Sequence, residues 1–133
     1  MIIFAVLVAA TITMSMVFKP PKKHGPIIDN IKERLKYIDS DFDNIPIYEG
    51  HSSYTENKTV VYICLKDPKT GKYYDMNTLM YVALHELAHV LSKNYGHDEE
   101  FKENFENLLT LAEKKGLYNR NIPMPTTYCG IDS

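Results

Sequence analysis

The stretch that decides the fold reads His85-Glu86-Leu87-Ala88-His89-Val90-Leu91-Ser92-Lys93-Asn94-Tyr95-Gly96-His97. Its first five residues have the pattern H-E-x-x-H, in which two histidines are four positions apart. Residues four apart lie on one face of a helix, so both imidazoles can bind the same metal ion. The glutamate between them is then placed to take a proton from a water molecule at the metal. The pattern is typical of zinc hydrolases and predicts a helix that carries a catalytic site.

A catalytic zinc ion needs three protein ligands and one open position for water. His85 and His89 supply two ligands, and we expect His97 to be the third. Gly96 allows the sharp turn that brings His97 back toward the helix. The alternative for His97 is a surface histidine at the start of the next helix. In the metal site, Glu86 is the expected catalytic base and zinc the expected cofactor.

Hydrophobic periodicity predicts three helices, over residues 27–38, 77–93 and 98–115. The middle helix carries the motif and is apolar almost all round, so we expect it to be buried. Asp75 or Asn77 can cap its start, and Gly116 can end the last helix. Asp98, Glu99 and Glu100 begin the last helix, where they favour its dipole. A contact of Asp98 with a metal-binding histidine is the weaker alternative.

Two strands are predicted, over residues 45–49 and 59–65, and the second has the stronger β-branched and aromatic composition. The turn residues 67–71 predict a return strand over 72–74 that forms a hairpin with the second strand. The fold class is therefore α+β, with the active-site helix packed on a short sheet or hairpin and flanked by helices. An extended substrate peptide is expected to pair with the edge of the strand at 59–65.

Residues 2–18 contain no charged side chain and predict a membrane anchor. A helix of this length spans roughly 25 Å, close to the bilayer hydrocarbon thickness of about 30 Å. A cleaved signal peptide is the alternative. However, no Lys or Arg precedes the apolar run, and the run is longer than the hydrophobic region of a usual signal peptide. We therefore expect a transmembrane anchor over 1–18, a linker over 19–25 and one domain over 26–133.

Lys19, Lys22 and Lys23 follow the apolar run directly. The excess of basic residues on the cytoplasmic side of membrane segments places the domain in the cytoplasm. Cys64 and Cys129 can form one disulfide, but in a reducing compartment we expect two thiols. Asn57-Lys58-Thr59 is an N-glycosylation acceptor that should stay unmodified in this orientation.

The 133 residues suit one small domain, and their formal net charge is −2. This balance provides no general field that attracts nucleic acid, although it is compatible with a local basic patch. His24 and His51 have no partner at metal-binding spacing and are expected at the surface.

The stretch from His85 to Phe101 resembles the WLM (Wss1p-like) metallopeptidases, which are related to the SprT-like group. The pattern of that family is H-E-L-A-H, a short spacer and then G/P-H-D-x-x-F. It is matched here by His85-Glu86-Leu87-Ala88-His89 and by Gly96-His97-Asp98-Glu99-Glu100-Phe101. The resemblance implies a small zincin-like domain in which the three histidines bind zinc and Glu86 is catalytic. As a small one-domain protein with an N-terminal hydrophobic segment, the chain resembles the WLM proteins of large DNA viruses.

Three functions remain in competition. The leading hypothesis is a membrane-anchored zinc metallopeptidase that acts on a protein or peptide, in a host or virion membrane if the chain is viral. The alternative is a non-catalytic membrane or virion protein that retains the fold for binding. A third is a protease of DNA-bound proteins, since members of the wider family act on such substrates. A basic patch near the cleft would favour it.

Overall fold

The computed structural model describes residues 22–129 and 131–132 of the chain. Three α-helices lie in this part, namely α2 (Pro26–Ile38), α3 (Met76–Leu91) and α4 (Glu99–Lys114), together with a short 3-10 helix, η1 (Ser40–Asn44). The strands are β1 (Ile47–Glu49), β2 (Tyr54–Glu56), β3 (Val60–Ile63), β4 (Thr127–Tyr128) and β5 (Ile131–Asp132). The described part is thus a small α+β domain, as the sequence predicts.

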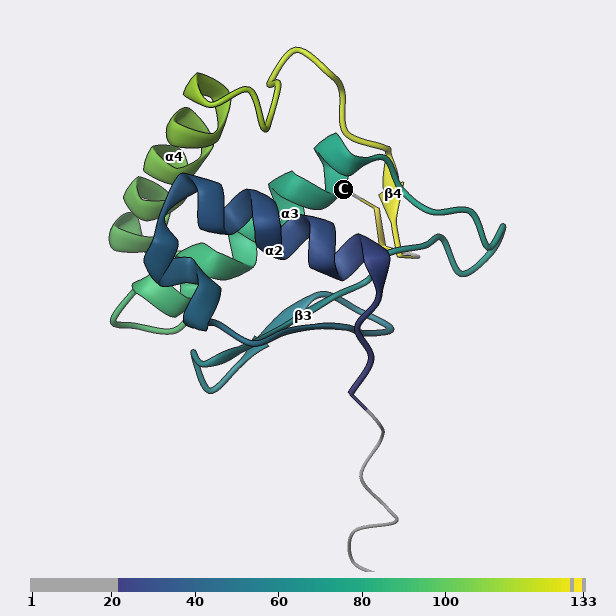
Figure 1. Cartoon of the computed structure of the whole chain (residues 1–133), viewed down its shortest axis with the longest axis horizontal. Coiled ribbons are helices and arrows are strands. Elements are labelled where there is room, and N and C mark those ends of the chain that lie inside the picture. Colours follow the sequence, from purple (N-terminus) through teal and green to yellow (C-terminus); the bar gives the residue numbers. More distant parts are fainter. Residues whose placement is uncertain (1–21, 130, 133) are drawn as a thin grey trace, which may run out of the picture.

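A mixed three-stranded sheet has the order β1-β3-β2. Strand β1 pairs with β3 in parallel, and β2 pairs with β3 antiparallel. Helices α2 and α3 cover one face of this sheet (Figure 1). The side chains of Ile47, Val61 and Ile63 are buried on that face. Since side chains alternate along a strand, Tyr48 and Tyr62 belong to the opposite face.

Helix α3 lies between the sheet and α4 and contacts β2, β3, α2 and α4. Its buried apolar residues are Leu79, Met80, Val82, Ala83, Leu84, Leu87 and Ala88. Asp75 caps its first turn, because its carboxylate accepts from the Thr78 amide at 3.3 Å and from the Thr78 hydroxyl at 2.6 Å. The helix that carries the motif is therefore held in the core, as its all-round hydrophobicity predicts.

The prediction that residues 72–74 form the second strand of a hairpin is wrong. Residues near 72–74 return only as one isolated bridge between Lys66 and Tyr73, whereas the strand that pairs with β3 in a hairpin is β2. Strand β2 was not predicted because its residues are mostly polar and its two outer residues are exposed. The correction also moves the expected peptide-binding edge. Strand β3 is central in the sheet, and within the described residues β1 and β2 are its two edge strands, of which β2 is the one that contacts Glu86.

The expectation of two thiols is also wrong, because Cys64 and Cys129 form a disulfide. Around it, the Cys129 amide donates to the Tyr74 hydroxyl, and the Tyr128 hydroxyl donates to the Cys64 carbonyl at 2.5 Å. The C-terminal tail, predicted without periodicity, thus returns to the end of β3 and adds the small pair β4-β5. The sequence allows this disulfide but could not establish it, since its formation depends on where the tail folds back.

Within residues 22–129 and 131–132, no helix combines the length and the hydrophobicity needed to cross a membrane. The predicted anchor over residues 2–18 lies outside the described part of the chain. The end of the predicted linker is described, and there Lys23 forms an isolated antiparallel β-bridge with Glu49, the last residue of β1.

Candidate active site

Three imidazoles converge between α3 and the start of α4. One ligand atom from each of His85, His89 and His97 lies within 4.8 Å of those of the other two. The Nε2 atoms of His89 and His97 are 3.2 Å apart. His85 and His89 are half-buried and His97 is exposed. The cluster is therefore open to solvent on the side of His97, where a substrate can approach.

The loop after α3 brings His97 to the cluster. Gly96 has a φ of 92°, a conformation that glycine adopts with little strain, so the chain turns at this point as expected. Asp98 caps α4 by accepting from the Phe101 amide at 2.9 Å, and it also accepts from Asn94 at 3.2 Å. These hydrogen bonds hold the pKa of Asp98 below its usual value. Its carboxylate thus serves the helix start, and the alternative contact with a histidine is not among its hydrogen bonds.

Phe101 packs against all three histidines. Its ring centroid lies 5.0 Å from that of His85, 4.3 Å from that of His89 and 4.7 Å from that of His97. Phe101 itself is buried, with 3% of its surface exposed. A rigid aromatic ring that touches each imidazole limits their rotation, so α4 helps to orient the cluster.

Glu86 lies beside the cluster and is buried, with 6% of its surface exposed. One carboxylate oxygen, Oε2, is 3.2 Å from His85 Nδ1. The other, Oε1, accepts a hydrogen bond of 2.9 Å from the Thr55 hydroxyl of β2. A carboxylate held at both oxygens has few alternative positions, which suits a group that must meet a proton at a defined place.

The environment of His89 favours its neutral form. Burial lowers the pKa of His89; the Glu86 carboxylate opposes this effect, and His85, His97 and Lys58 reinforce it. Only a neutral imidazole can donate its lone pair to a metal ion. The shift therefore reduces competition between protons and a metal at this residue.

The cluster fits a zinc ion by donor type and by spacing. Two nitrogens that bind one tetrahedral zinc at about 2.0–2.1 Å lie about 3.3–3.4 Å apart. The His89–His97 separation of 3.2 Å is close to that value. Among the residues that the structure describes, the group consists of these three histidines, which matches the ligand count of catalytic zinc sites that keep one position open.

The sequence relatives of the chain are uncharacterised viral proteins. Protein 042R of Invertebrate iridescent virus 3 is 42% identical over 90 residues, which cover 68% of this chain and 57% of the relative. Protein 136R of Invertebrate iridescent virus 6 is 38% identical over 122 residues, which cover 87% and 66%. Protein R325 of Acanthamoeba polyphaga mimivirus is 34% identical over 114 residues, which cover 82% and 56%. The matches thus span 56–66% of the length of these relatives. No family model matches the chain.

Among solved structures, Wss1 from Saccharomyces cerevisiae superposes with a TM-score of 0.58. The match covers 68% of this chain and 80% of that chain, at 20% sequence identity. A structure of a Wss1 mutant gives the same score, with 69% and 82% covered. The domain has the Wss1 fold. The likeness to Wss1 extends over most of the described domain, beyond the motif itself.

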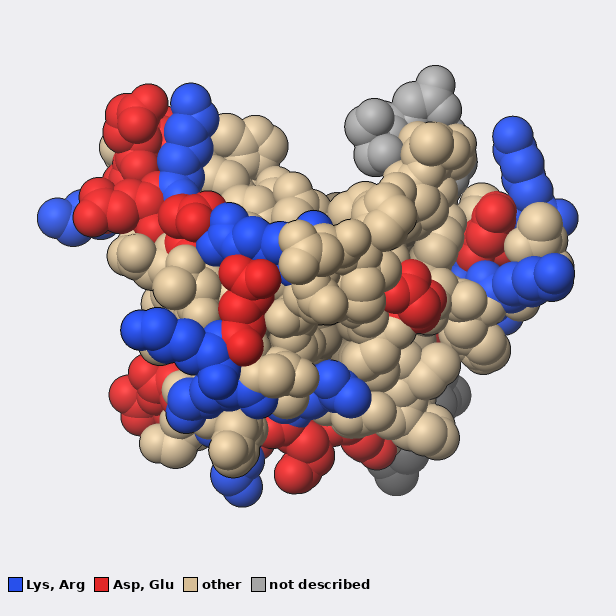
Figure 2. Space-filling view, turned by 90° about the horizontal axis from the view of Figure 1, so that it is seen from above, with Lys and Arg blue, Asp and Glu red and all other residues tan. Residues whose placement is uncertain are grey.

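The other predicted surface residues lie away from the cluster. His24 and His51 are exposed, and neither belongs to a metal-binding group in the described residues. Figure 2 shows basic and acidic side chains next to one another on one face of the Wss1-like domain, without a uniformly basic area there. That face gives no support to a nucleic-acid interface.

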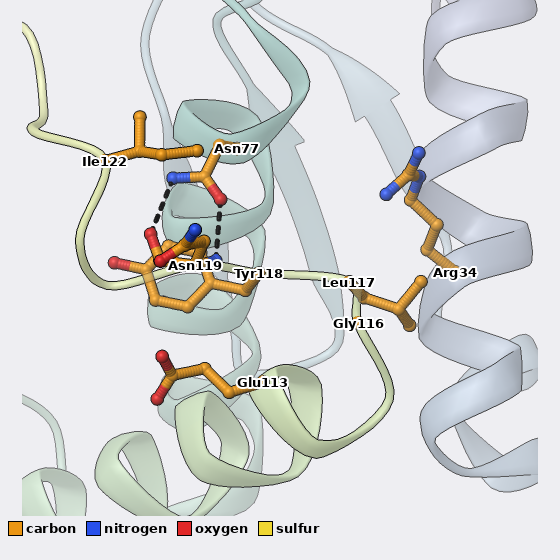
Figure 3. A pocket seen from close by; sticks show the side chains of 8 residues that line it. All are labelled: Arg34, Asn77, Glu113, Gly116, Leu117, Tyr118, Asn119 and Ile122. Atoms are coloured by element: carbon orange, nitrogen blue, oxygen red, sulfur yellow. Dashed lines mark hydrogen bonds between the residues drawn. The ribbon is translucent and has the colours of Figure 1, made fainter.

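A pocket of about 520 Å³ opens at the start of α3 (Figure 3). Asn77, which lines it, is eight residues before His85, or roughly 12 Å along the helix axis. Both polar atoms of the Asn77 side chain bond the backbone of Asn119, at 3.1 and 2.8 Å. The Glu113 carboxylate pairs with Arg120. Since these lining groups already have partners and the cluster is distant, we assign the pocket no role.

Sequence reasoning missed two residues of the site. Thr55 lies in the unpredicted strand β2, and nothing in the local pattern links it to Glu86. Phe101 ends the matched family motif, but its contact with the three imidazoles was not predicted, because it depends on how α4 packs against α3.

Proposed function

We propose that this chain is a zinc-dependent metallopeptidase that hydrolyses peptide bonds in a protein or peptide substrate. The observation that carries the proposal is the convergence of three imidazoles beside a buried glutamate on one helix. His85, His89 and His97 are the proposed zinc ligands, and Glu86 is the proposed catalytic base. The H-E-x-x-H pattern and the Wss1 fold support the same function.

Zinc bound by the three histidines would lower the pKa of a water molecule and polarise the scissile carbonyl. Glu86 takes a proton from the attacking water at its carboxylate and later delivers it to the nitrogen of the leaving amine. Phe101 keeps the imidazoles oriented, and the contact with Thr55 keeps the carboxylate in place. The exposure of His97 leaves the approach open for a substrate.

An extended peptide is the proposed substrate form. Strand β2 is at the edge of the sheet, and its central residue Thr55 contacts the proposed base. A peptide that pairs with this edge uses main-chain hydrogen bonds and so requires no particular sequence. Its scissile bond would then run past the cluster. Unfolded or flexible protein segments are therefore the proposed substrate class.

We expect the purified full chain in detergent to bind one zinc ion and to cleave an unstructured protein such as casein. Cleavage should stop with a zinc chelator and return when zinc is added, because the proposed base has no activated water without the metal. Zinc content and product masses are the measurements. A chain that binds zinc stoichiometrically but cleaves no unstructured substrate would support the alternative, a non-catalytic membrane or virion protein.

We further propose that residues 2–18 anchor the chain in a membrane as a single span, and that Lys19, Lys22 and Lys23 keep the domain cytoplasmic. The disulfide between Cys64 and Cys129 favours the opposite side, since disulfides persist in oxidising compartments. The lysines and the disulfide therefore make opposite predictions about whether Asn57 is glycosylated. Asn57 is exposed in the turn between β2 and β3, where a glycosyltransferase would reach it.

In eukaryotic cells, the full chain should show no change in gel mobility after glycosidase treatment, because the domain is expected on the cytoplasmic side. A secreted reporter protein with an N-glycosylation site is the positive control for the treatment. A mobility shift that disappears in Asn57→Gln would reverse the orientation and would agree with the disulfide.

A further inference from the structure

On the inner face of the three-stranded sheet, a polar side chain of β2 contacts helix α3. Apart from the half-buried Glu49 at the end of β1, the residues of β1 and β3 on this face are Ile47, Val61 and Ile63, all buried and apolar. The corresponding residue of β2 is Thr55, which is paired in register with Val61. Its hydroxyl points to α3 and reaches Glu86 at two atoms, Oε1 at 2.9 Å and the carbonyl oxygen at 3.0 Å.

Of the two acceptors of the Thr55 hydroxyl, the Glu86 carboxylate is the one that depends more on this hydrogen bond. Residue 86 lies in the interior of α3, where its carbonyl already accepts from the amide four residues later. The carboxylate has no such backbone partner, and its other oxygen is 3.2 Å from His85. A hydrogen bond to a charged group contributes more than one between neutral groups. The contact therefore acts mainly on the orientation of the Glu86 side chain.

Strand β2 is held at both ends, which makes Thr55 a firm support. Before the strand, Ser53 bonds the Tyr128 hydroxyl at 2.6 Å and accepts from the Cys64 amide at 2.9 Å. Burial raises the pKa of Tyr128 to about 12, so this phenol stays protonated. After the strand, the Lys58 ammonium donates to the carbonyls of Ser92 and, at 2.7 Å, of Asn94. These contacts fix both ends of β2 in addition to its pairing with β3.

We infer that Thr55 is a positioning residue for Glu86: its hydroxyl fixes the carboxylate in the place where the base must meet the attacking water. The inference rests on the proposed function and adds a residue from a different element to the site. It also links the strand proposed to bind the peptide with the group proposed to move the proton. Loss of the hydroxyl should slow the chemical step while peptide binding and metal binding stay intact.

Thr55→Val tests this in the full chain, because valine keeps the shape and the strand preference of threonine but has no hydroxyl. We expect kcat for an unstructured peptide to fall about tenfold or more, as for loss of a hydrogen bond to a charged group. KM should stay within about twofold, and zinc content should stay at one per chain. Thr55→Ser, which restores a hydroxyl, should recover most of kcat. Thr59→Val, at an exposed turn hydroxyl, should behave as wild type.

A wild-type kcat in Thr55→Val would overturn the inference, as would a rise in KM alone, a loss of zinc, or an equal loss in Thr55→Ser. Crystal structures of the metal-free wild type and Thr55→Val provide a readout that does not depend on activity. The Glu86 carboxylate should occupy one position in the wild type and should leave it in Thr55→Val. If it stays, the inference fails whatever the activity. If it moves but the wild type cleaves nothing, the proposed function fails and the positioning role stands.

Discussion

Replacement of Glu86 by glutamine should leave zinc bound and abolish most of the cleavage. Glutamine has nearly the same shape and still accepts from the Thr55 hydroxyl through its amide oxygen, but it cannot take a proton. Since general acid–base catalysis contributes roughly 10²–10⁴-fold, we expect kcat to fall by about that factor. The measurements are peptide cleavage rates and zinc content for the full chain in detergent.

Glu103→Gln is the matched control, because it makes the same change of charge at an exposed position of α4. It should retain both zinc and cleavage. Cleavage by Glu86→Gln at the wild-type rate would show that the proposed base is wrong. Loss of zinc in the same variant would show instead that Glu86 acts in metal binding.

The second large effect is expected for His89→Ala, which should lose both zinc and activity. Removal of a group that merely supports a metal ligand lowers metal affinity by about 10–100-fold, so loss of a ligand should cost more than about 100-fold. His89 also stacks on Phe101 at 4.3 Å, so the variant loses part of the packing that orients the cluster. Zinc affinity by competition with a chelator is the measurement.

Thermal unfolding separates the loss of a ligand from the loss of the fold. A metal that binds only the folded state raises the melting temperature, so zinc should stabilise the wild type and His51→Ala but not His89→Ala. His51 is exposed and outside the cluster, which makes it the matched control. A His89→Ala protein that zinc stabilises as strongly as the wild type would remove His89 from the ligand set.

The helices could be predicted because their apolar residues recur at helical spacing. For α2, the prediction of 27–38 differs from the observed Pro26–Ile38 by one residue. Strand β2 could not be predicted by alternation, because its inward residue is the polar Thr55, which faces Glu86 and not the apolar core. The polar residue that made the strand hard to predict is also the residue that connects it to the candidate site.

The candidate cluster could be predicted in part because its residues are close in sequence. His85 and His89 are one helical turn apart, and Gly96 signals the turn that returns His97. The supports of the site come from distant segments, and their contacts follow from the fold. Ser53 meets Tyr128 75 positions away, and the disulfide closes a separation of 65 residues. No local pattern carries information about such pairs.

Zinc K-edge X-ray absorption of the zinc-loaded full chain tests the central claim most directly, because it reads the identity and distance of the metal ligands. Three nitrogen ligands at about 2.0–2.1 Å and one further light atom are expected, with imidazole scattering from His85, His89 and His97. The spectrum of His97→Ala should lose one imidazole. Sulfur ligands at about 2.3 Å, or a wild-type spectrum unchanged in His97→Ala, would contradict the account.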